Sequence, residues 1–133
     1  MSLVKLLPAW FHAIADYGVG IALIVGAALT TSAPNKAVAT GIVVGAVVLA
    51  VSMATKYPLG VVKVLPFTVH SAGDYLAAAL LILGPFVVGF DGSSGGLTAF
   101  YIAAGAAVLA VSLITNYQYS PKRQATVAAP ATA

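Results

Sequence analysis

Apolar residues fill four long stretches of the chain, and short segments that contain polar residues, proline or glycine separate them. The stretches run from about Pro8 to Leu29, from about Val38 to Thr55, from about Pro66 to Phe90 and from about Leu97 to Asn116. A helix needs about 20 apolar residues to cross the roughly 30 Å of hydrocarbon in a bilayer. Each stretch reaches this length, so the pattern predicts four transmembrane helices.

The separating segments contain residues that end helices. Residues 30–36 are polar and include Pro34, residues 56–60 include a proline and a glycine, and residues 91–96 read Asp-Gly-Ser-Ser-Gly-Gly. Proline cannot continue a helix, and clusters of glycine and serine favour loops. These breaks divide the chain into two helical hairpins joined by a middle loop.

Composition agrees with a location in the membrane. The 133-residue chain is 61% hydrophobic and 7% charged, whereas about a quarter of the residues of a soluble domain are charged. Cysteine is absent, which excludes disulfides, thiolate metal ligands and cysteine nucleophiles. The net charge of +3 comes from scattered basic residues, so we expect no nucleic-acid partner.

The basic residues fall unequally on the two sides of the predicted bundle. The side of both termini and the middle loop carries Lys5, Lys56, Lys63, Lys122 and Arg123, and the other side carries Lys36. Basic residues mark the cytoplasmic side of a membrane protein. We therefore expect a four-span protein of the bacterial cytoplasmic membrane with both termini in the cytoplasm and membrane lipids around it.

The two hairpins repeat one another in sequence. The runs Val4-Lys5-Leu6-Leu7-Pro8 and His12-x-x-x-Asp16-Tyr17 recur 58 residues later as Val62-Lys63-Val64-Leu65-Pro66 and His70-x-x-x-Asp74-Tyr75. The segment 45–52 recurs at 105–112, and Thr55-x-Tyr57 recurs as Thr115-x-Tyr117, now 60 residues later. Each unit has two spans, so both units enter the membrane in the same direction and are related by an axis along its normal.

The sequence thus predicts an all-α membrane fold, a four-helix bundle of two tandem hairpins with a pseudo-twofold axis along the membrane normal. We assign residues 1–119 to this single domain, with repeat 1 at about 4–57 and repeat 2 at about 62–117. Residues 120–133 are rich in alanine, threonine, proline and valine, which predicts a flexible C-terminal tail.

Outside the loops and termini, His12, Asp16, His70 and Asp74 are the ionisable groups placed near or within the hydrocarbon. A charged side chain in the centre of a membrane helix costs about 2.5–3.5 kcal/mol, so it normally faces protein and has a partner. The i, i+4 spacing puts each histidine and aspartate on one helix face, where the imidazole can donate to the carboxylate.

Two interpretations of these pairs stay open. They can lock a hydrogen bond between helices, which is the role we expect, without a catalytic residue, metal ligand or cofactor. They can instead form a proton relay, a metal site or a pocket for a headgroup, quinone or haem where the hairpins meet. The candidate residues for cofactor binding are then His12, Asp16, Tyr17, His70, Asp74 and Tyr75. With Tyr57 and Tyr117, the two tyrosines of this set also suit an aromatic belt at the cytoplasmic ends of the spans.

The repeated run Val-Lys-x-Leu-Pro-x-x-x-His-x-x-x-Asp-Tyr precedes a helix ending Leu83-Gly84-Pro85-Phe86-Val87-Val88-Gly89-Phe90 and a second helix ending Thr-x-Tyr. This arrangement resembles the bacterial SPW-repeat membrane proteins, in which each unit contributes two spans and its first helix ends in Ser-Pro-Trp. Here Gly84-Pro85-Phe86 keeps the proline and an aromatic residue, and the first hairpin reads Gly26-Ala27-Ala28 instead. The resemblance implies the fold and implies no activity.

No residue pattern indicates a nucleophile with its base, and the loops are too short to build a water-excluding active site. We therefore expect a non-enzymatic protein that acts by association, either as a homo-oligomer or as an accessory subunit of a larger membrane complex, such as an energy-transducing one. The alternative is a small ion-, proton- or cofactor-handling membrane protein that uses the duplicated His/Asp pairs.

Overall fold

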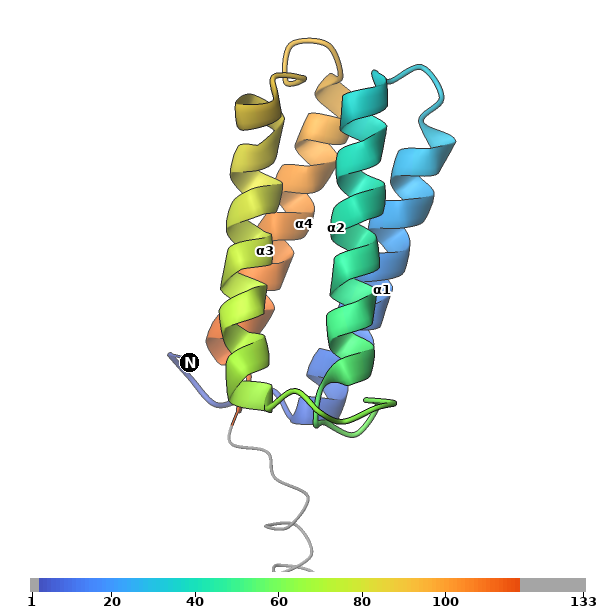
Figure 1. Cartoon of the computed structure of the whole chain (residues 1–133). Helices are drawn as coiled ribbons and strands as arrows, with labels where there is room; N and C mark the ends of the chain where they lie inside the picture. Colours follow the sequence, from blue (N-terminus) through green and yellow to red (C-terminus); the bar gives the residue numbers. More distant parts are fainter. Residues whose placement is uncertain (1–2, 118–133) are drawn as a thin grey trace, which may run out of the picture.

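The computed structural model describes residues 3–117, which form an up-and-down bundle of four helices (Figure 1). The helices are α1 (Ala9–Leu29), α2 (Asn35–Ala54), α3 (Phe67–Val88) and α4 (Gly95–Ile114). Each is long and apolar enough to cross a membrane. The predicted all-α four-helix fold is confirmed, while the predicted flexible tail at 120–133 lies outside the described residues.

Prolines mark the starts of three of these helices. Pro8, Pro34 and Pro66 are the N-cap residues of α1, α2 and α3. The first turn of a helix leaves its backbone N–H groups without intrahelical partners, so proline costs little there. Helix α2 consequently begins at Asn35, earlier than the predicted Val38, because Pro34 starts this helix as well as separating it from α1.

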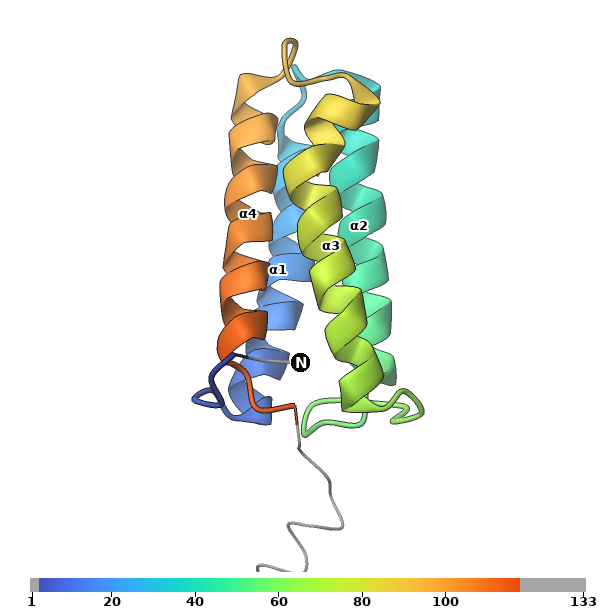
Figure 2. The same ribbon diagram turned by 90° about the vertical axis from the view of Figure 1, so that its left-hand side faces the viewer.

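The helices pack mainly within their own hairpins, and the contacts between hairpins, α1 with α4 and α2 with α3, are sparser. Figure 2 shows α3 beside α2, one of these two contacts between the hairpins. Glycine permits the close approach inside each hairpin: a Cβ added at Gly45 would lie 2.7 Å from the Gly20 oxygen, and one added at Gly105 would lie 2.9 Å from the Ala78 oxygen. Small residues commonly let membrane helices approach in this way.

Two short backbone pairings tie the hairpins together at the end of the bundle that holds the middle loop, which we call the middle-loop end. The backbone N–H groups of residues 3, 4, 6 and 7 donate to the carbonyl oxygens of Leu113 and Ile114, at the end of α4, over 2.8–3.1 Å. The backbone N–H groups of residues 61, 62, 64 and 65 donate to the carbonyl oxygens of Met53 and Ala54, at the end of α2, over 2.7–2.9 Å. We call these pairings the two clasps; they supply partners for carbonyls that a helix end leaves unpaired.

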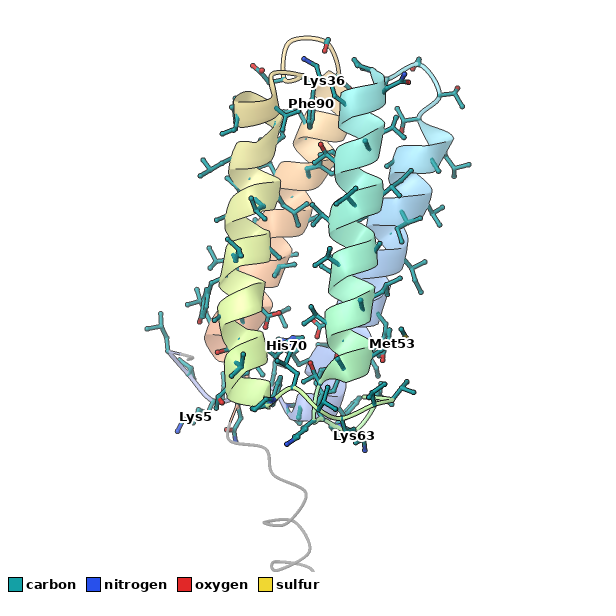
Figure 3. The ribbon with its side chains drawn as sticks, in the orientation of Figure 1. Lys5, Lys36, Met53, Lys63, His70 and Phe90 are labelled. Carbon is teal, nitrogen blue, oxygen red and sulfur yellow. The ribbon has the colours of Figure 1, made fainter. Side chains whose placement is uncertain are left out.

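The described basic residues lie at the two ends of the bundle, as their order in the chain requires. Figure 3 shows Lys5 and Lys63 at the middle-loop end and Lys36 at the opposite end, beside Phe90. The Lys36 ammonium group donates to the carbonyl oxygens of Val88 and Gly89 at the end of α3, where a cation suits the helix dipole. Which end faces the cytoplasm stays a prediction.

Candidate functional site

The two histidines and two aspartates that the sequence singled out meet between the hairpins. Helix α1 contributes His12 and Asp16, and α3 contributes His70 and Asp74. All four are buried, with exposed fractions from 1% to 7%, and Figure 3 shows His70 between the helices towards the middle-loop end. The predicted pairing within each helix is confirmed. In α1, His12 Nε2 lies 3.3 Å from Asp16 Oδ1, and in α3, His70 Nε2 lies 2.9 Å from Asp74 Oδ1.

Each imidazole also reaches the carboxylate of the other hairpin. His12 Nε2 lies 3.1 Å from Asp74 Oδ2, and His70 Nε2 lies 3.0 Å from Asp16 Oδ2. The two Nε2 atoms are 3.4 Å apart. Each carboxylate therefore spans both histidines, with one oxygen near each ring. We call His12, Asp16, His70 and Asp74 the His/Asp centre.

Two threonines determine which ring nitrogens face this centre. His12 Nδ1 lies 2.7 Å from Thr115 Oγ1, and His70 Nδ1 lies 2.8 Å from Thr55 Oγ1. Each threonine hydroxyl donates its own hydrogen to the carbonyl oxygen four residues earlier, at 2.6 and 2.7 Å respectively. Such a hydroxyl has only its lone pairs left for the imidazole, so Nδ1 carries a hydrogen and donates it. The Nε2 atoms are left to bind a proton or an ion.

Two tyrosines hold the carboxylates. The Tyr57 hydroxyl donates to Asp16 Oδ2 at 3.1 Å, and the Tyr117 hydroxyl donates to Asp74 Oδ2 at 2.6 Å. Both tyrosines follow the ends of helices and are buried, with exposed fractions of 0% and 4%. Burial, and next the nearby aspartate, raise the pKa of both phenols. The phenols therefore stay protonated and remain donors.

An aromatic cluster lies against the His/Asp centre. The Phe67 ring centroid is 5.3 Å from that of Tyr57 and 4.7 Å from that of Tyr117. It also lies 5.4 Å from the His12 ring and 5.8 Å from the His70 ring. The position 58 residues before Phe67 is Ala9, so one phenylalanine serves both histidines.

Four of the six predicted site residues converge, and a fifth takes another role. The Tyr17 hydroxyl donates to the Leu59 carbonyl oxygen in the middle loop, at 2.9 Å. Tyr75 is half-buried at the equivalent position of α3. Sequence reasoning missed the threonines, and its aromatic-belt interpretation was wrong for Tyr57 and Tyr117, because both are buried against aspartates. The repeated Thr-x-Tyr motif at the ends of α2 and α4 was the sequence signal that could have identified these threonines and tyrosines as site residues.

The geometry of the His/Asp centre can accommodate a small ion as well as shared protons. Each Nε2 has at most one hydrogen for two carboxylate oxygens, and two such N–H groups would face each other across 3.4 Å. Neutral imidazole and carboxylate are common ligands of divalent transition metals. Ligands about 2.0–2.1 Å from a tetrahedral ion lie about 3.4 Å apart, close to the observed 2.9–3.3 Å between Nε2 and oxygen atoms.

Haem does not fit this arrangement. A haem held by both histidines needs the porphyrin ring between their coordinating nitrogens, and the carboxylates of Asp16 and Asp74 bridge the two Nε2 atoms instead. The donor set therefore favours a bare ion over this cofactor.

Comparisons of the chain with protein-family models, with curated proteins and with solved structures find no match. The resemblance to SPW-repeat membrane proteins stays a prediction that rests on the sequence motifs.

Proposed function

We propose that this integral membrane protein binds one divalent transition-metal ion in the His/Asp centre, and that Zn²⁺ is the ion the donor set suits best. His12 and His70 would bind it through Nε2, and Asp16 and Asp74 through carboxylate oxygens. One observation carries the proposal: two imidazoles with anchored Nδ1 atoms and two carboxylates from different hairpins converge in a buried site. Zn²⁺ accepts tetrahedral nitrogen and oxygen ligands.

Charge balance supports a divalent ion. Two carboxylates and two neutral imidazoles carry a charge of −2, which a divalent cation cancels. An uncompensated charge is costly in the interior of a protein or a membrane. Two protons, one on each Nε2, give the same balance, so one ion would replace two protons without leaving a net charge.

The surrounding hydrogen bonds support the same assignment. Metal-binding histidines usually donate their other ring nitrogen to a second residue, which fixes the ring, and ligating carboxylates are hydrogen-bonded in turn. Thr115 and Thr55 do the first for the histidines, and Tyr57 and Tyr117 do the second for the aspartates.

Metal stoichiometry tests the proposal. The purified protein, equilibrated with Zn²⁺ and passed through a desalting column, should retain one Zn²⁺ per chain by elemental analysis. The Asp16→Asn/Asp74→Asn double variant should retain none, whereas Asp91→Asn in the exposed turn should behave as the parent protein. Circular dichroism and size-exclusion chromatography establish that the double variant is folded.

Two results would overturn the metal centre. One is a parent protein that retains no metal after loading, and the other is a folded double variant that still holds one Zn²⁺. Should the double variant unfold, Co²⁺ replaces the variant as the test, because Co²⁺ bound by four nitrogen and oxygen ligands absorbs strongly in the visible range. Parent protein without that band would count against the site.

We further propose that the middle-loop end faces the cytoplasm of a bacterial cell. Three basic residues lie at that end, Lys5 before α1 and Lys56 and Lys63 in the middle loop, whereas Lys36 lies at the opposite end. Basic residues are enriched on the cytoplasmic side of membrane proteins. A reporter fused after Ala133 and one inserted near Gly92 should report opposite sides of the membrane, with the first in the cytoplasm. The reverse result would refute the orientation.

Association with other subunits or with further copies of the chain, in a non-enzymatic role, stays the second prediction. Large apolar side chains exposed along the outer faces, such as Leu83 and Val87, suit lipid and protein neighbours equally. Native mass spectrometry of gently extracted protein distinguishes protein neighbours from lipid neighbours. A monomer without a co-purifying chain would argue against association and leave the metal centre unaffected.

A further inference from the structure

Two cavities flank the His/Asp centre, one at each interface between the hairpins. The cavity between α2 and α3 has a volume of about 310 Å³, and its wall includes His70 and Asp74. The cavity between α1 and α4 has a volume of about 260 Å³, and its wall includes His12 and Asp16. The other residues of both walls are aliphatic or glycine. We call these cavities the lateral pockets.

The lateral pockets are equivalent in the two hairpins. Val47, Val48 and Val51 of α2 line the first, and Ala107, Val108 and Val111 of α4, each 60 residues later, line the second. On the facing helices, the wall residues at 73, 74 and 77 correspond to those at 15, 16 and 19. A cavity that recurs at both equivalent interfaces is a property of the shared sequence motif and not a packing defect at one interface.

Both pockets lie where the bundle faces hydrocarbon. The α2/α3 pocket is bordered by Val47, Leu76 and Leu80, which are 56%, 61% and 51% exposed. These residues belong to helices of membrane-spanning length, and Figure 1 shows α2 and α3 side by side along the bundle. An apolar chain can pass from the bilayer into such a pocket without desolvating polar groups.

We infer that each lateral pocket binds a single-chain amphiphile whose compact, uncharged head carries a hydroxyl group. Its chain would lie along the valine wall and its head would rest against the His/Asp pair at the wall's polar end. The inference rests on the proposed metal centre and names the class of ligand that reaches it. A charged head would unbalance a neutral buried centre, which is costly, whereas a neutral hydroxyl can donate to a carboxylate oxygen of Asp74 or Asp16 at the wall.

Two glycines allow the pockets to be filled without disturbing their surroundings. Gly73 lines the α2/α3 pocket and Gly18 lines the α1/α4 pocket. A Cβ added at either position meets no atom within 4 Å, so a leucine side chain would occupy the pocket itself. Gly84 has the same open surroundings and belongs to neither wall, so Gly84→Leu is a matched control.

The test uses the full chain loaded with Co²⁺ in deuterated detergent, with n-decanol as the probe. Paramagnetic Co²⁺ broadens proton resonances steeply with proximity, and the same chain loaded with Zn²⁺ gives the diamagnetic reference. We expect the methylene next to the decanol hydroxyl to be broadened several-fold more than the terminal methyl group. This gradient should be lost in Gly18→Leu/Gly73→Leu and retained in Gly84→Leu.

Each alternative outcome has a separate meaning. A Co²⁺-loaded chain that broadens decanol uniformly, or that treats n-decane in the same way, would show that ordinary bilayer chains fill the pockets, and this would overturn the inference while leaving the metal centre intact. A gradient that persists in Gly18→Leu/Gly73→Leu would overturn it as well. A chain that takes up no Co²⁺ overturns the metal centre first and this inference with it.

Discussion

Replacing Thr115 by valine should weaken metal binding while leaving the helices in place. The hydroxyl accepts the Nδ1 hydrogen of His12 over 2.7 Å, and valine offers a similar volume without that acceptor. His12 is 1% exposed, so water does not replace the lost partner. An unsatisfied buried donor costs about 1–3 kcal/mol.

The expected loss of affinity follows from the same contact. Removing the residue that orients a metal-binding histidine typically lowers affinity about 10–100-fold, or about 1.4–2.8 kcal/mol. This range agrees with the cost of the unpaired Nδ1 hydrogen. We therefore expect the Zn²⁺ dissociation constant of Thr115→Val to rise about 10–100-fold, and that of Thr55→Val to rise equally, because its hydroxyl plays the same part for His70.

A competition titration against a chromophoric Zn²⁺ chelator at fixed pH measures this change. Thr98→Val is the matched control: it makes the same substitution in α4, at a buried hydroxyl that has no hydrogen-bond partner among residues 3–117. Its dissociation constant should equal that of the parent protein. Parent-like binding by Thr115→Val, or equal weakening by Thr98→Val, would refute the reasoning that the threonine anchors a metal ligand.

Three further predictions concern the tyrosines that hold the centre and the packing elsewhere in the bundle. Phenol absorbance during alkaline titration should show Tyr57 and Tyr117 still protonated above about pH 10, where exposed tyrosines ionise, because burial and a neighbouring aspartate raise their pKa. The two phenols stabilise the fold fully below the pKa of tyrosine in the unfolded chain, and this stabilisation is lost as the pH rises through their raised pKa in the folded protein. Ionisation of all tyrosines of the folded protein in one absorbance step at about pH 10 would contradict this prediction. Tyr101→Phe should destabilise the fold by about 0.6–1.7 kcal/mol in detergent unfolding, because its buried hydroxyl donates to a backbone carbonyl of α2 at 2.7 Å, and unchanged stability would dismiss that bond. Gly45→Ala should cost about 1–3 kcal/mol in the same assay, since its Cβ would lie 2.7 Å from a backbone oxygen of α1, whereas Gly84→Ala, in open space, should cost nothing.

Hydropathy, helix periodicity and the internal repeat were sufficient to predict the helices and the four residues of the His/Asp centre. The membrane sets one length for every span, so apolar runs bounded by prolines and glycines locate helices closely. The i, i+4 spacing of His12 and Asp16 fixes their common face, and the cost of a buried charge requires a protein partner. Repetition of the pair at His70 and Asp74 indicated a shared site where the hairpins meet.

The threonines and tyrosines that hold the centre depend on how the chain leaves each helix, which periodicity does not describe. Thr55 and Thr115 follow the last helical residues, and the tyrosines two positions later turn back under the bundle. Tyrosine near a helix end is common at a membrane surface, so composition alone favoured the belt. Helix periodicity also does not predict that each histidine bonds to the threonine of the other hairpin. His12 bonds to Thr115, which follows α4, and His70 bonds to Thr55, which follows α2.

The two clasps differ in when they can form during synthesis. Residues 61–65 pair with the end of α2, which the ribosome has already delivered, so that clasp closes at once. Residues 3–7 must wait for Leu113 and Ile114, and His12 and Asp74 wait with them for Thr115 and Tyr117. A chain halted before α4 can therefore bring the four residues of the His/Asp centre together, but it lacks the threonine that anchors His12 and the tyrosine that holds Asp74, so the centre is completed last.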